Sequence, residues 1–371
     1  MTHVMARRIA FVSAVCGLVL VGTAGQAGAQ PAAGSGSRWT IEVFGGVAAG
    51  SEGTSGSVAP ARPAGAPFTT EAGRPSRQVP SWFFGDGALL LNQVIEQFEG
   101  ISGASLPRMV SLDAALGRSA ATRAGGAAFG VRLGRAIGDR LAVDVSVERS
   151  LTSLGFTDEV SAALDASSDA FEAAFNGLLA TAPVTMLAVN SQVTRDDRSS
   201  SQTRIDASVR WTVARRGRLE AYLRGGGGVV LNSGDAPRAV INGNYSFRLF
   251  GFFAMQETDR VVIELTQPKS AAMGAVGAGF TYDLSASTGV RVDARLSLSR
   301  NATTVMVSGS PSITTQASGD VLPSATTPGI QFSSRAGVLS SLSAPATTWT
   351  TFSGSGLSRH VAVSIGLFRR F

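Results

Sequence analysis

The sequence predicts an all-β protein: a closed antiparallel transmembrane β-barrel of about eight strands, with long extracellular loops that contain short helices. Apolar and polar residues alternate with period two in eight segments along the chain, as in strands with one apolar face. The connections between these segments are alternately short and long. Every tight turn therefore falls at one end of the sheet and every long loop at the other, an asymmetry typical of membrane barrels.

The composition argues against two other classes of protein. Hydrophobic residues make up 44% of the chain, too many for a wholly disordered protein. After residue 30 no apolar run approaches the ~18 residues of a membrane-spanning helix. The remaining classes are a glycine-rich soluble β protein and a β-barrel that meets lipid with alternate residues only.

The basic isoelectric point, near 10.5, does not indicate nucleic-acid binding. Lys and Arg number 32 against 26 for Asp and Glu. Three Tyr, two His and a single Lys leave few groups that titrate between about pH 5 and 10, so a small Arg excess keeps the isoelectric point high. No basic run or cluster of Arg and aromatic residues is present, and we expect no nucleic-acid partner.

Residues 1–29 predict a cleaved signal peptide, which leaves residues 30–371 as the mature barrel domain. Arg7 and Arg8 precede an apolar run, and small residues end in the cleavage motif Ala-Gly-Ala. A lipoprotein is the alternative, because the only cysteine, Cys16, follows Ser-Ala-Val, but valine is large for the position before a modified cysteine. Cleavage removes Cys16, so the exported chain has no disulfide.

The alternation is strict in four segments and weaker in four others. In the clearest segment the odd positions are aliphatic and the even positions are small or charged. The strict segments are Leu141–Glu148, Ile205–Val213, Val290–Ser299 and Val361–Phe368, and the weaker ones are Trp39–Val47, Phe129–Ile137, Leu219–Leu231 and Ala272–Leu284.

The connections divide into three tight turns and four long loops. The long loops hold more than half of the mature chain, and loops on a rigid scaffold commonly carry function. The turns fall at residues 138–139, 215–217 and 285–287, and the loops near residues 51–124, 152–199, 233–269 and 303–355.

The apolar face of the strands is expected to meet lipid. Near the tight turns it carries Trp39, Trp211, Tyr282 and Phe371, which predict an aromatic belt at the periplasmic interface. At the opposite end the same face carries three arginines, which are candidates for contact with lipid phosphates or for ordinary solvated side chains. These arginines are Arg149, Arg300 and Arg359.

The opposite face of the strands is expected to point into the barrel. The interior of an eight-stranded barrel is only wide enough for side chains to fill, so charges there must pair. Six Arg and six acidic residues predict a salt-bridged plug rather than a water-filled pore. They are Glu42, Arg132, Asp144, Glu148, Arg204, Asp206, Arg210, Glu220, Arg224, Arg291, Asp293 and Arg295.

The last strand completes a resemblance to the small outer-membrane barrels of Gram-negative envelopes, the OmpA-like and OmpW-like proteins. Val363, Ile365, Leu367 and Phe371 alternate up to a terminal aromatic residue, although Arg369 departs from the usual apolar residue. The resemblance implies that these four residues form the signal read by the barrel-assembly machinery. It also implies outer-membrane lipids, including lipopolysaccharide, as partners.

Two helices are predicted within the loops. Asp86 is the candidate N-cap of the first, and Thr157 begins the second, which carries acidic residues in its first turn and ends before Gly177. Their apolar positions predict that they pack as a cap on the barrel mouth, with a place on the outer leaflet as the alternative.

A hairpin is predicted in the third loop. Tyr245–Met255 and Val261–Leu265, joined by residues 257–260, alternate like strands. If this hairpin enters the membrane, the barrel has ten strands. The fourth loop, residues 303–355, is rich in Ser, Thr, Ala and Gly and is expected to be flexible or ordered by a ligand.

The sequence does not predict a catalytic, cofactor or metal site. The one histidine of the mature chain, His360, shares a strand face with Ser358 and Ser364, about 7 Å and more than about 12 Å away along the strand. A serine nucleophile must lie within ~3 Å of its base, so neither serine is placed for hydrolysis. One His and no Cys also leave too few metal ligands.

Two functions follow as expectations. The first is a non-enzymatic surface barrel whose long loops serve envelope integrity or contact with a ligand or another cell, with the surface ligand unidentified. The alternative is a narrow channel for small or apolar solutes, lined by Phe44, Tyr222 and Phe368.

Overall fold

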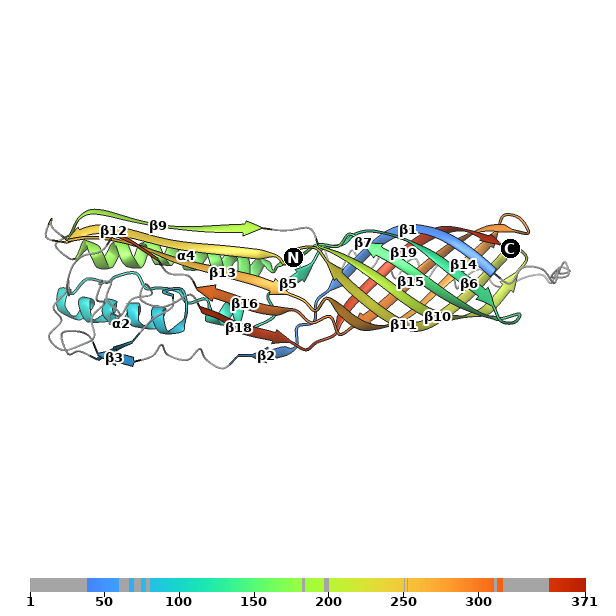
Figure 1. Ribbon diagram of the computed structural model, residues 1–371, viewed down its shortest axis with the longest axis horizontal. Coiled ribbons are helices and arrows are strands. Elements are labelled where there is room, and N and C mark those ends of the chain that lie inside the picture. Colours follow the sequence, from blue (N-terminus) through green and yellow to red (C-terminus); the bar gives the residue numbers. More distant parts are fainter. Residues whose placement is uncertain are drawn as a thin grey trace.

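The computed structural model describes residues 39–59, 67–69, 75–77, 81–181, 184–196, 200–249, 251, 253–309, 312–315 and 347–371. The predicted signal peptide and part of the fourth loop lie outside the described residues. The molecule is elongated, with a barrel at one end and a lobe of strands and helices that extends from it (Figure 1).

Eight strands close into an antiparallel barrel, which confirms the predicted fold class. The first strand, β1, pairs with both β6 and the last strand, β19, so the barrel has no open edge. The strands are β1 (Trp39–Ser51), β6 (Gly126–Ala136), β7 (Leu141–Ser150), β10 (Ser201–Arg216), β11 (Leu219–Ser233), β14 (Ser270–Asp283), β15 (Thr288–Ser299) and β19 (Ser358–Arg370).

The barrel wall has an apolar outside and a polar inside, because successive side chains of a strand point to opposite faces. On β7, Val145 is 46% exposed, whereas its neighbours Asp144 and Ser146 are fully buried. The tight turn between β10 and β11 needs Gly217, whose φ of +58° favours a residue without a Cβ. The tight turns and the C-terminus lie at the end of the barrel away from the lobe (Figure 1).

The long connections of the barrel form the lobe. Its strands build a second sheet in the order β2, β18, β16, β13, β12 and β9, with β17 paired to β13. The chain passes between the two bodies at the short connections from β11 to β12, from β13 to β14, from β15 to β16 and from β18 to β19. The lobe strands are β2 (Gly56–Val58), β9 (Val184–Asp196), β12 (Arg238–Leu249), β13 (Phe253–Thr266), β16 (Thr304–Gly309), β17 (Ser312–Thr315) and β18 (Thr347–Gly354).

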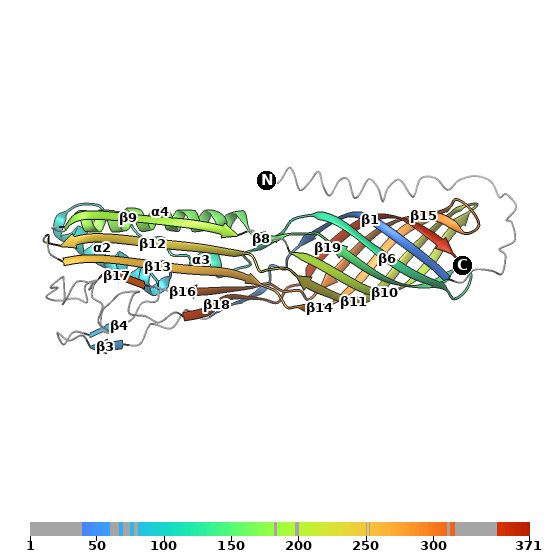
Figure 2. The same cartoon turned by 45° about the horizontal axis from the view of Figure 1, so that its top comes forward.

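Three helices, α2 (Gly85–Ser102), α3 (Asp113–Leu116) and α4 (Asp158–Ala180), form the second layer of the lobe (Figure 2). They pack against one face of the second sheet, and the aromatic rings of Phe175 and Tyr245 stack at 4.6 Å between the layers. The expectation that these helices cap the barrel mouth or lie on the outer leaflet was therefore wrong. Two small strand pairs complete the fold, β3 (Pro67–Thr69) with β4 (Pro75–Arg77) and β5 (Ala121–Arg123) with β8 (Leu154–Phe156).

Helix α4 begins as predicted but ends later. The Thr157 hydroxyl accepts a hydrogen bond from the Val160 amide at 3.3 Å, so Thr157 is the N-cap. The helix continues through Gly177 to Ala180, because Leu178 and Leu179 extend its buried face. The predicted end at Gly177 was wrong.

The predicted N-cap of α2 was also wrong. Asp86 lies inside the helix, and Phe84 occupies the cap position without a capping side chain. The carboxylate of Asp113, in α3, instead accepts a hydrogen bond from the Gly85 amide at 2.6 Å. The cap therefore comes from a residue that is remote in sequence.

The predicted hairpin is present as β12 and β13, but the position of its turn differs from the prediction, and the hairpin is not part of the barrel. The chain turns near Gly251, whose φ is +74°, rather than at residues 257–260, which are part of β13. Both strands belong to the second sheet, so the ten-stranded alternative was wrong. Within the described residues, no helix is long and apolar enough to cross a membrane.

Candidate functional site

The barrel interior is the first candidate site, because charged side chains fill it. All twelve predicted interior charges point inward, and all but Arg210 are buried. Each of the six arginines lies within 4 Å of at least one of the six carboxylates. The interior is thus filled by a network of ion pairs that joins inward-facing side chains of different strands.

Asp293 is the centre of this network. Its Oδ2 accepts hydrogen bonds from Arg132 at 2.8 Å and from Arg224 at 2.9 Å. Its Oδ1 accepts a hydrogen bond from the Tyr222 hydroxyl at 3.0 Å. One carboxylate on β15 thereby holds side chains from β6 and β11 across the lumen.

A second centre lies toward the lobe, at Asp206 on β10. Its carboxylate accepts hydrogen bonds from Arg224 at 2.8 Å, Arg295 at 3.0 Å and the Ser146 hydroxyl at 2.5 Å. Arg295 also pairs with Glu148, which lies 3.8 Å from Arg204. These contacts link β7, β10, β11 and β15.

The same pattern continues toward the tight turns. Glu42 pairs with Arg291 at 2.9 Å and Arg132 at 3.2 Å, and Asp144 lies 3.4 Å from Arg210 and 3.6 Å from Arg291. Glu220 completes the row, 3.7 Å from Arg210 and 2.6 Å from Arg215 at the rim. Such pairs are desolvated, so removal of one partner leaves a buried charge uncompensated.

The three aromatic side chains that a channel would expose are packed into this network. Phe44, Tyr222 and Phe368 are each at least 97% buried. The Arg132 guanidinium lies 5.1 Å from the Phe44 ring centre, and that of Arg291 lies 5.7 Å from Tyr222 and 5.8 Å from Phe368. The rings therefore fill space between arginines instead of lining an open passage.

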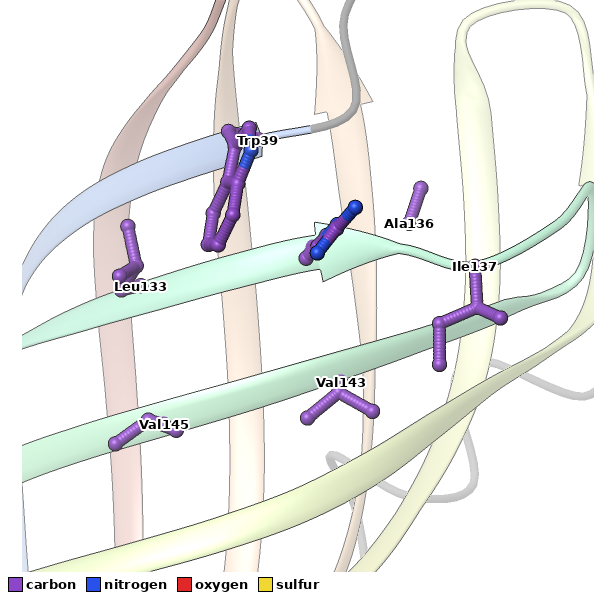
Figure 3. A pocket seen from close by; sticks show the side chains of 7 residues that line it. Trp39, Leu133, Ala136, Ile137, Val143 and Val145 are labelled. Atoms are coloured by element: carbon purple, nitrogen blue, oxygen red, sulfur yellow. The ribbon is translucent and has the colours of Figure 1, made fainter.

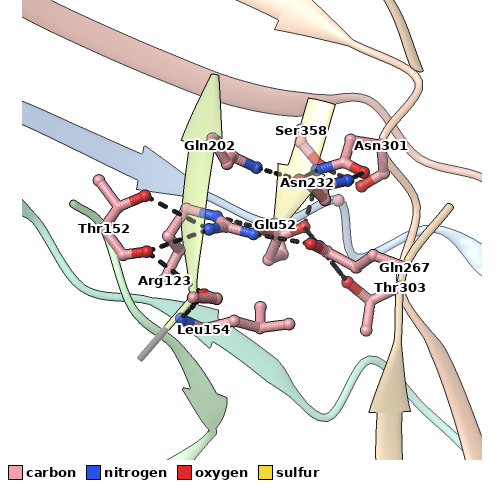
Figure 4. Close-up of polar contacts among 12 residues, drawn as sticks. Glu52, Arg123, Thr152, Leu154, Gln202, Asn232, Gln267, Asn301, Thr303 and Ser358 are labelled. Atoms are coloured by element: carbon pink, nitrogen blue, oxygen red, sulfur yellow. Dashed lines mark hydrogen bonds and ion pairs between the residues drawn. The ribbon is translucent and has the colours of Figure 1, made fainter. Parts of the chain in front are cut away.

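The second candidate site is the junction of barrel and lobe, where Glu52 follows the end of β1. Its Oε1 accepts a hydrogen bond from Arg123 Nε at 2.6 Å (Figure 4). Its Oε2 accepts from Gln267 at 3.0 Å, Ser358 at 3.0 Å and Thr303 at 3.3 Å. Side chains from four other connections between the barrel and the lobe therefore meet at this one buried carboxylate.

Arg123 extends these contacts to the other side of the junction. Its guanidinium donates to Gln267 Oε1 at 2.9 Å and to the Thr152 hydroxyl at 3.3 Å. The side chains of Glu52 and Arg123 are 1% and 3% exposed, so this ion pair is shielded from solvent where the barrel meets the lobe. Sequence reasoning missed both residues, because no local pattern marks two loop positions that meet only after the barrel closes.

The residues of the predicted aromatic belt and of the predicted assembly signal lie on the apolar outer face of the barrel. Trp39, Trp211 and Tyr282 are 40–50% exposed near the tight turns. Phe371 is 61% exposed, and its backbone exchanges two hydrogen bonds with Trp39, at 3.1 and 3.3 Å. Val363, Ile365 and Leu367 point outward from β19 on the same face.

A shallow groove of about 560 Å³ lies on this wall beside Trp39 (Figure 3). Leu133, Ile137, Val143 and Val145 contribute its apolar lining. The Arg135 guanidinium lies over the Trp39 ring at 5.1 Å. The groove lies on the apolar outer face of the barrel, and Arg135 is the charged residue in its lining.

The three arginines proposed for lipid phosphates lie at the lobe end of the barrel. Arg149, Arg300 and Arg359 are all exposed on the outer wall. Arg149 donates a hydrogen bond to the Ser201 hydroxyl at 3.2 Å. Arg359 is opposite Leu298 in the β15–β19 pair, close to Arg300.

His360 lies inside the barrel, buried and opposite Ser297. The Ser358 hydroxyl donates to Glu52 and to the Asn301 carbonyl, at 3.0 and 2.7 Å. Neither ring nitrogen of His360 has a hydrogen-bond partner among the described residues. No group of three or more His, Cys, Asp or Glu that could hold a metal occurs in that part of the chain.

No family model and no curated protein matches the chain. Among solved structures, the outer membrane protease OmpT from Escherichia coli aligns over 90% of this chain and 97% of its own, with 8% identity and a TM-score of 0.33. The translocator domain of the autotransporter NalP from Neisseria meningitidis aligns over 100% and 96%, with 8% identity and a TM-score of 0.22. The toluene transporter TodX from P. putida covers 91% of each chain, with 9% identity and a TM-score of 0.18. Similarity at this level indicates no shared activity.

Proposed function

We propose that this protein is a non-enzymatic outer-membrane β-barrel with a sealed lumen, which anchors its lobe at the cell surface. The sealed lumen carries the proposal, because twelve paired charges and three packed aromatic rings occupy the space that a solute would need. The apolar outer face and the aromatic belt support a place in a bilayer, where a closed barrel leaves no backbone group unpaired.

The orientation follows from the asymmetry of the two ends. Membrane barrels keep short turns on the periplasmic side and long loops outside the cell. We therefore place the tight turns and Phe371 toward the periplasm and the lobe outside. Export by a cleaved signal peptide, residues 1–29, and insertion by the barrel-assembly machinery are parts of this proposal.

The lobe is the part that would meet ligands, other cells or the envelope surface. Its helices cover one face of the second sheet, while the other face presents a row of polar side chains. Thr258 donates to Asn244 at 2.7 Å, and Asn244 donates to Asn190 at 2.9 Å, across three strands of that face. A polar sheet surface in a lobe that extends from the barrel suits contact with another molecule rather than transport.

Surface labelling tests the location and the orientation together. Cysteine introduced by Thr348→Cys, in the lobe, should react with a membrane-impermeant maleimide on intact cells. Cysteine introduced by Asp139→Cys, in a tight turn, should react only after the outer membrane is opened. Recovery of the protein as a soluble periplasmic species, or equal labelling of both sites on intact cells, would refute the proposal.

Planar-bilayer recording tests the sealed lumen against the channel alternative. The purified wild-type barrel should show no steady conductance, because its ion pairs leave no continuous aqueous path. Steady openings of the folded wild-type protein would favour the channel for small or apolar solutes.

A further inference from the structure

The excess positive charge of the chain is concentrated at the tight-turn end of the barrel. Lys and Arg exceed Asp and Glu by six, and Arg7 and Arg8 of the predicted signal peptide account for two of these. The other four lie at the tight-turn end, and the rest of the chain is balanced. This end carries seven arginines, Arg135, Arg140, Arg215, Arg216, Arg218, Arg369 and Arg370, and three acidic residues, Asp139, Glu220 and Asp283.

The acidic residues at this end leave most of the arginines uncompensated. Glu220 pairs with Arg215 at 2.6 Å, and Asp283 pairs with Arg370 at 2.7 Å. Asp139 is the remaining acid, and it is exposed in the turn between β6 and β7. The net charge of this surface is therefore positive after its own ion pairs are formed.

Three of the arginines are exposed and have no partner of their own. Arg140 lies in the turn before β7, Arg218 in the turn between β10 and β11, and Arg369 near the end of β19. Among the described residues, none of these three side chains has a hydrogen-bond or ion-pair partner. Their guanidinium groups are thus available to a ligand.

The spacing of these cations indicates the shape of the ligand. Around the barrel the strand order is β19, β1, β6, β7, β10 and β11, so two to three strand spacings separate one of the three arginines from the next. That is about 10–14 Å, too far for two of them to converge on a single phosphate or carboxylate. In an extended peptide, every third residue recurs at about 10 Å. A linear ligand with several acid groups therefore fits the arc.

The turn between β10 and β11 extends beyond the aromatic belt. β10 pairs with β7 only as far as Trp211, but with β11 as far as Arg216. These five further residues span about 16 Å along the strand, or about 12 Å along the barrel axis at a tilt of about 40°. The headgroup layer beside the hydrocarbon is only about 5–8 Å thick. With Trp211 at the interface, Arg218 lies in the aqueous periplasm rather than among lipid headgroups.

Exposed apolar residues lie beside the arginines. Ile137 is 68% exposed, the largest value for a large hydrophobic residue in the described part of the barrel. It follows the end of β6, between Arg135 and Arg140, and lies two residues past the position that pairs with Trp39 (Figure 3). Arginine next to apolar side chains is typical of protein interfaces. An acidic polysaccharide would leave Ile137 without an apolar partner.

We propose that the tight-turn end of the barrel docks an extended acidic segment of a periplasmic protein. The carboxylates of this segment pair with Arg140 and Arg218, and an apolar side chain packs on Ile137. Guanidinium suits this role, because it binds a carboxylate through two parallel N–H···O hydrogen bonds. The proposal goes beyond the function of the lobe, and it rests on the orientation proposed above.

The test measures binding of a synthetic peptide to the full-length folded protein in a zwitterionic detergent. The peptide is about 18 residues long, with glutamate at every third position, valine beside one glutamate and serine elsewhere. Arg140→Glu with Arg218→Glu should weaken binding by about tenfold or more at low salt, because two attractions become repulsions. Arg300→Glu with Arg359→Glu makes the same charge change at exposed arginines of the lobe end and should alter affinity less than about twofold.

Two further measurements identify the class of ligand. Ile137→Ser should weaken peptide binding by about threefold. Polygalacturonate with the same number of carboxylates should bind the wild-type protein more weakly than the peptide and should not respond to Ile137→Ser. Equal affinity of the two double variants would overturn the site. Binding of polygalacturonate as tight as that of the peptide, or no effect of Ile137→Ser, would overturn the peptide assignment.

Reconstitution in nanodiscs tests anionic lipid as the occupant. The peptide should bind the wild-type protein in nanodiscs of phosphatidylcholine and, with at most a modest loss, in nanodiscs that contain phosphatidylglycerol. Complete loss of binding in the anionic nanodiscs would mean that headgroups occupy these arginines, and the proposal would fail.

Cysteine labelling at Asp139→Cys separates this proposal from the proposed orientation. If the turn reacts only after the outer membrane is opened and the peptide does not bind in detergent, the docking surface alone fails. If the turn reacts on intact cells, the orientation fails and with it a periplasmic partner, even when the peptide binds in detergent.

Discussion

Arg123 Nε donates to Glu52 Oε1 over 2.6 Å, with both side chains almost completely buried. Glu52 follows the first barrel strand, and Arg123 lies in β5, just before the second barrel strand. The pair joins the two ends of the first long loop at the lobe end of the barrel. Through Gln267, Thr303 and Ser358 the pair also contacts three further connections between the barrel and the lobe.

Glu52→Gln should loosen the lobe from the barrel. The substitution leaves Arg123 buried without a counter-charge, which costs about 3 kcal/mol or more of folding free energy. We expect faster cleavage of the crossings by a protease added to the detergent-folded protein. Glu264→Gln is the matched control, since its pair with Arg238 is 3.6 Å long and about 40% exposed, and it should cost less than about 1 kcal/mol. Equal protease resistance of wild type and Glu52→Gln would contradict this role.

Asp293→Asn should destabilise the barrel itself. Asp293 is the carboxylate that Arg132 and Arg224 share, so the substitution weakens two buried pairs and should cost about 3 kcal/mol. The measurement is the urea midpoint of unfolding in detergent. Asp283→Asn removes a partly exposed pair with Arg370 at 2.7 Å and should shift the midpoint little. If both variants unfold at the same urea concentration, the lumen network does not stabilise the barrel as argued.

Val145→Asp should block membrane assembly, because it places a charge on the lipid face at a cost of about 2 kcal/mol. Ser297→Asp should be better tolerated, since Ser297 faces the lumen two residues from Arg295. The yield of heat-modifiable barrel in outer membranes is the measurement. Similar yields for the two variants would mean that the lipid face has been assigned incorrectly.

Phe371→Ala should lower the amount of folded barrel in cells more than it lowers stability. The ring is 61% exposed, so its loss removes little buried surface, while the backbone hydrogen bonds to Trp39 remain. The comparison is yield in cells against refolding of the purified variant into detergent. Near-normal refolding with poor cellular yield supports an assembly signal, and a parallel fall of both would leave Phe371 as a packing residue only.

The sequence alone determined the barrel. Alternation is a local property of each strand, and Val145 beside Ser146 already fixes which side chains face outward and which face the lumen. The alternating short and long connections predicted that the tight turns lie at one end of the barrel and the long loops at the other. The equal numbers of inward Arg and acidic residues predicted paired charges in the lumen. Thr157 marked the start of α4 for the same reason, because an N-cap acts within one helical turn.

Only the tertiary structure decided which partners meet. Arg132 and Asp293 are 161 residues apart, and closure of the barrel brings them within 2.8 Å. Ser146 faces the lumen as alternation requires, but its hydrogen bond to Asp206, 60 residues away in the sequence, forms only in the closed barrel. The sequences of the four long loops, taken one at a time, predicted two helices and a hairpin. The second sheet and the Glu52–Arg123 pair could not be predicted in this way, because they join different loops that the closed barrel brings to the same rim. Local sequence encodes strand faces and helix starts, whereas contacts between loops exist only after the chain has folded.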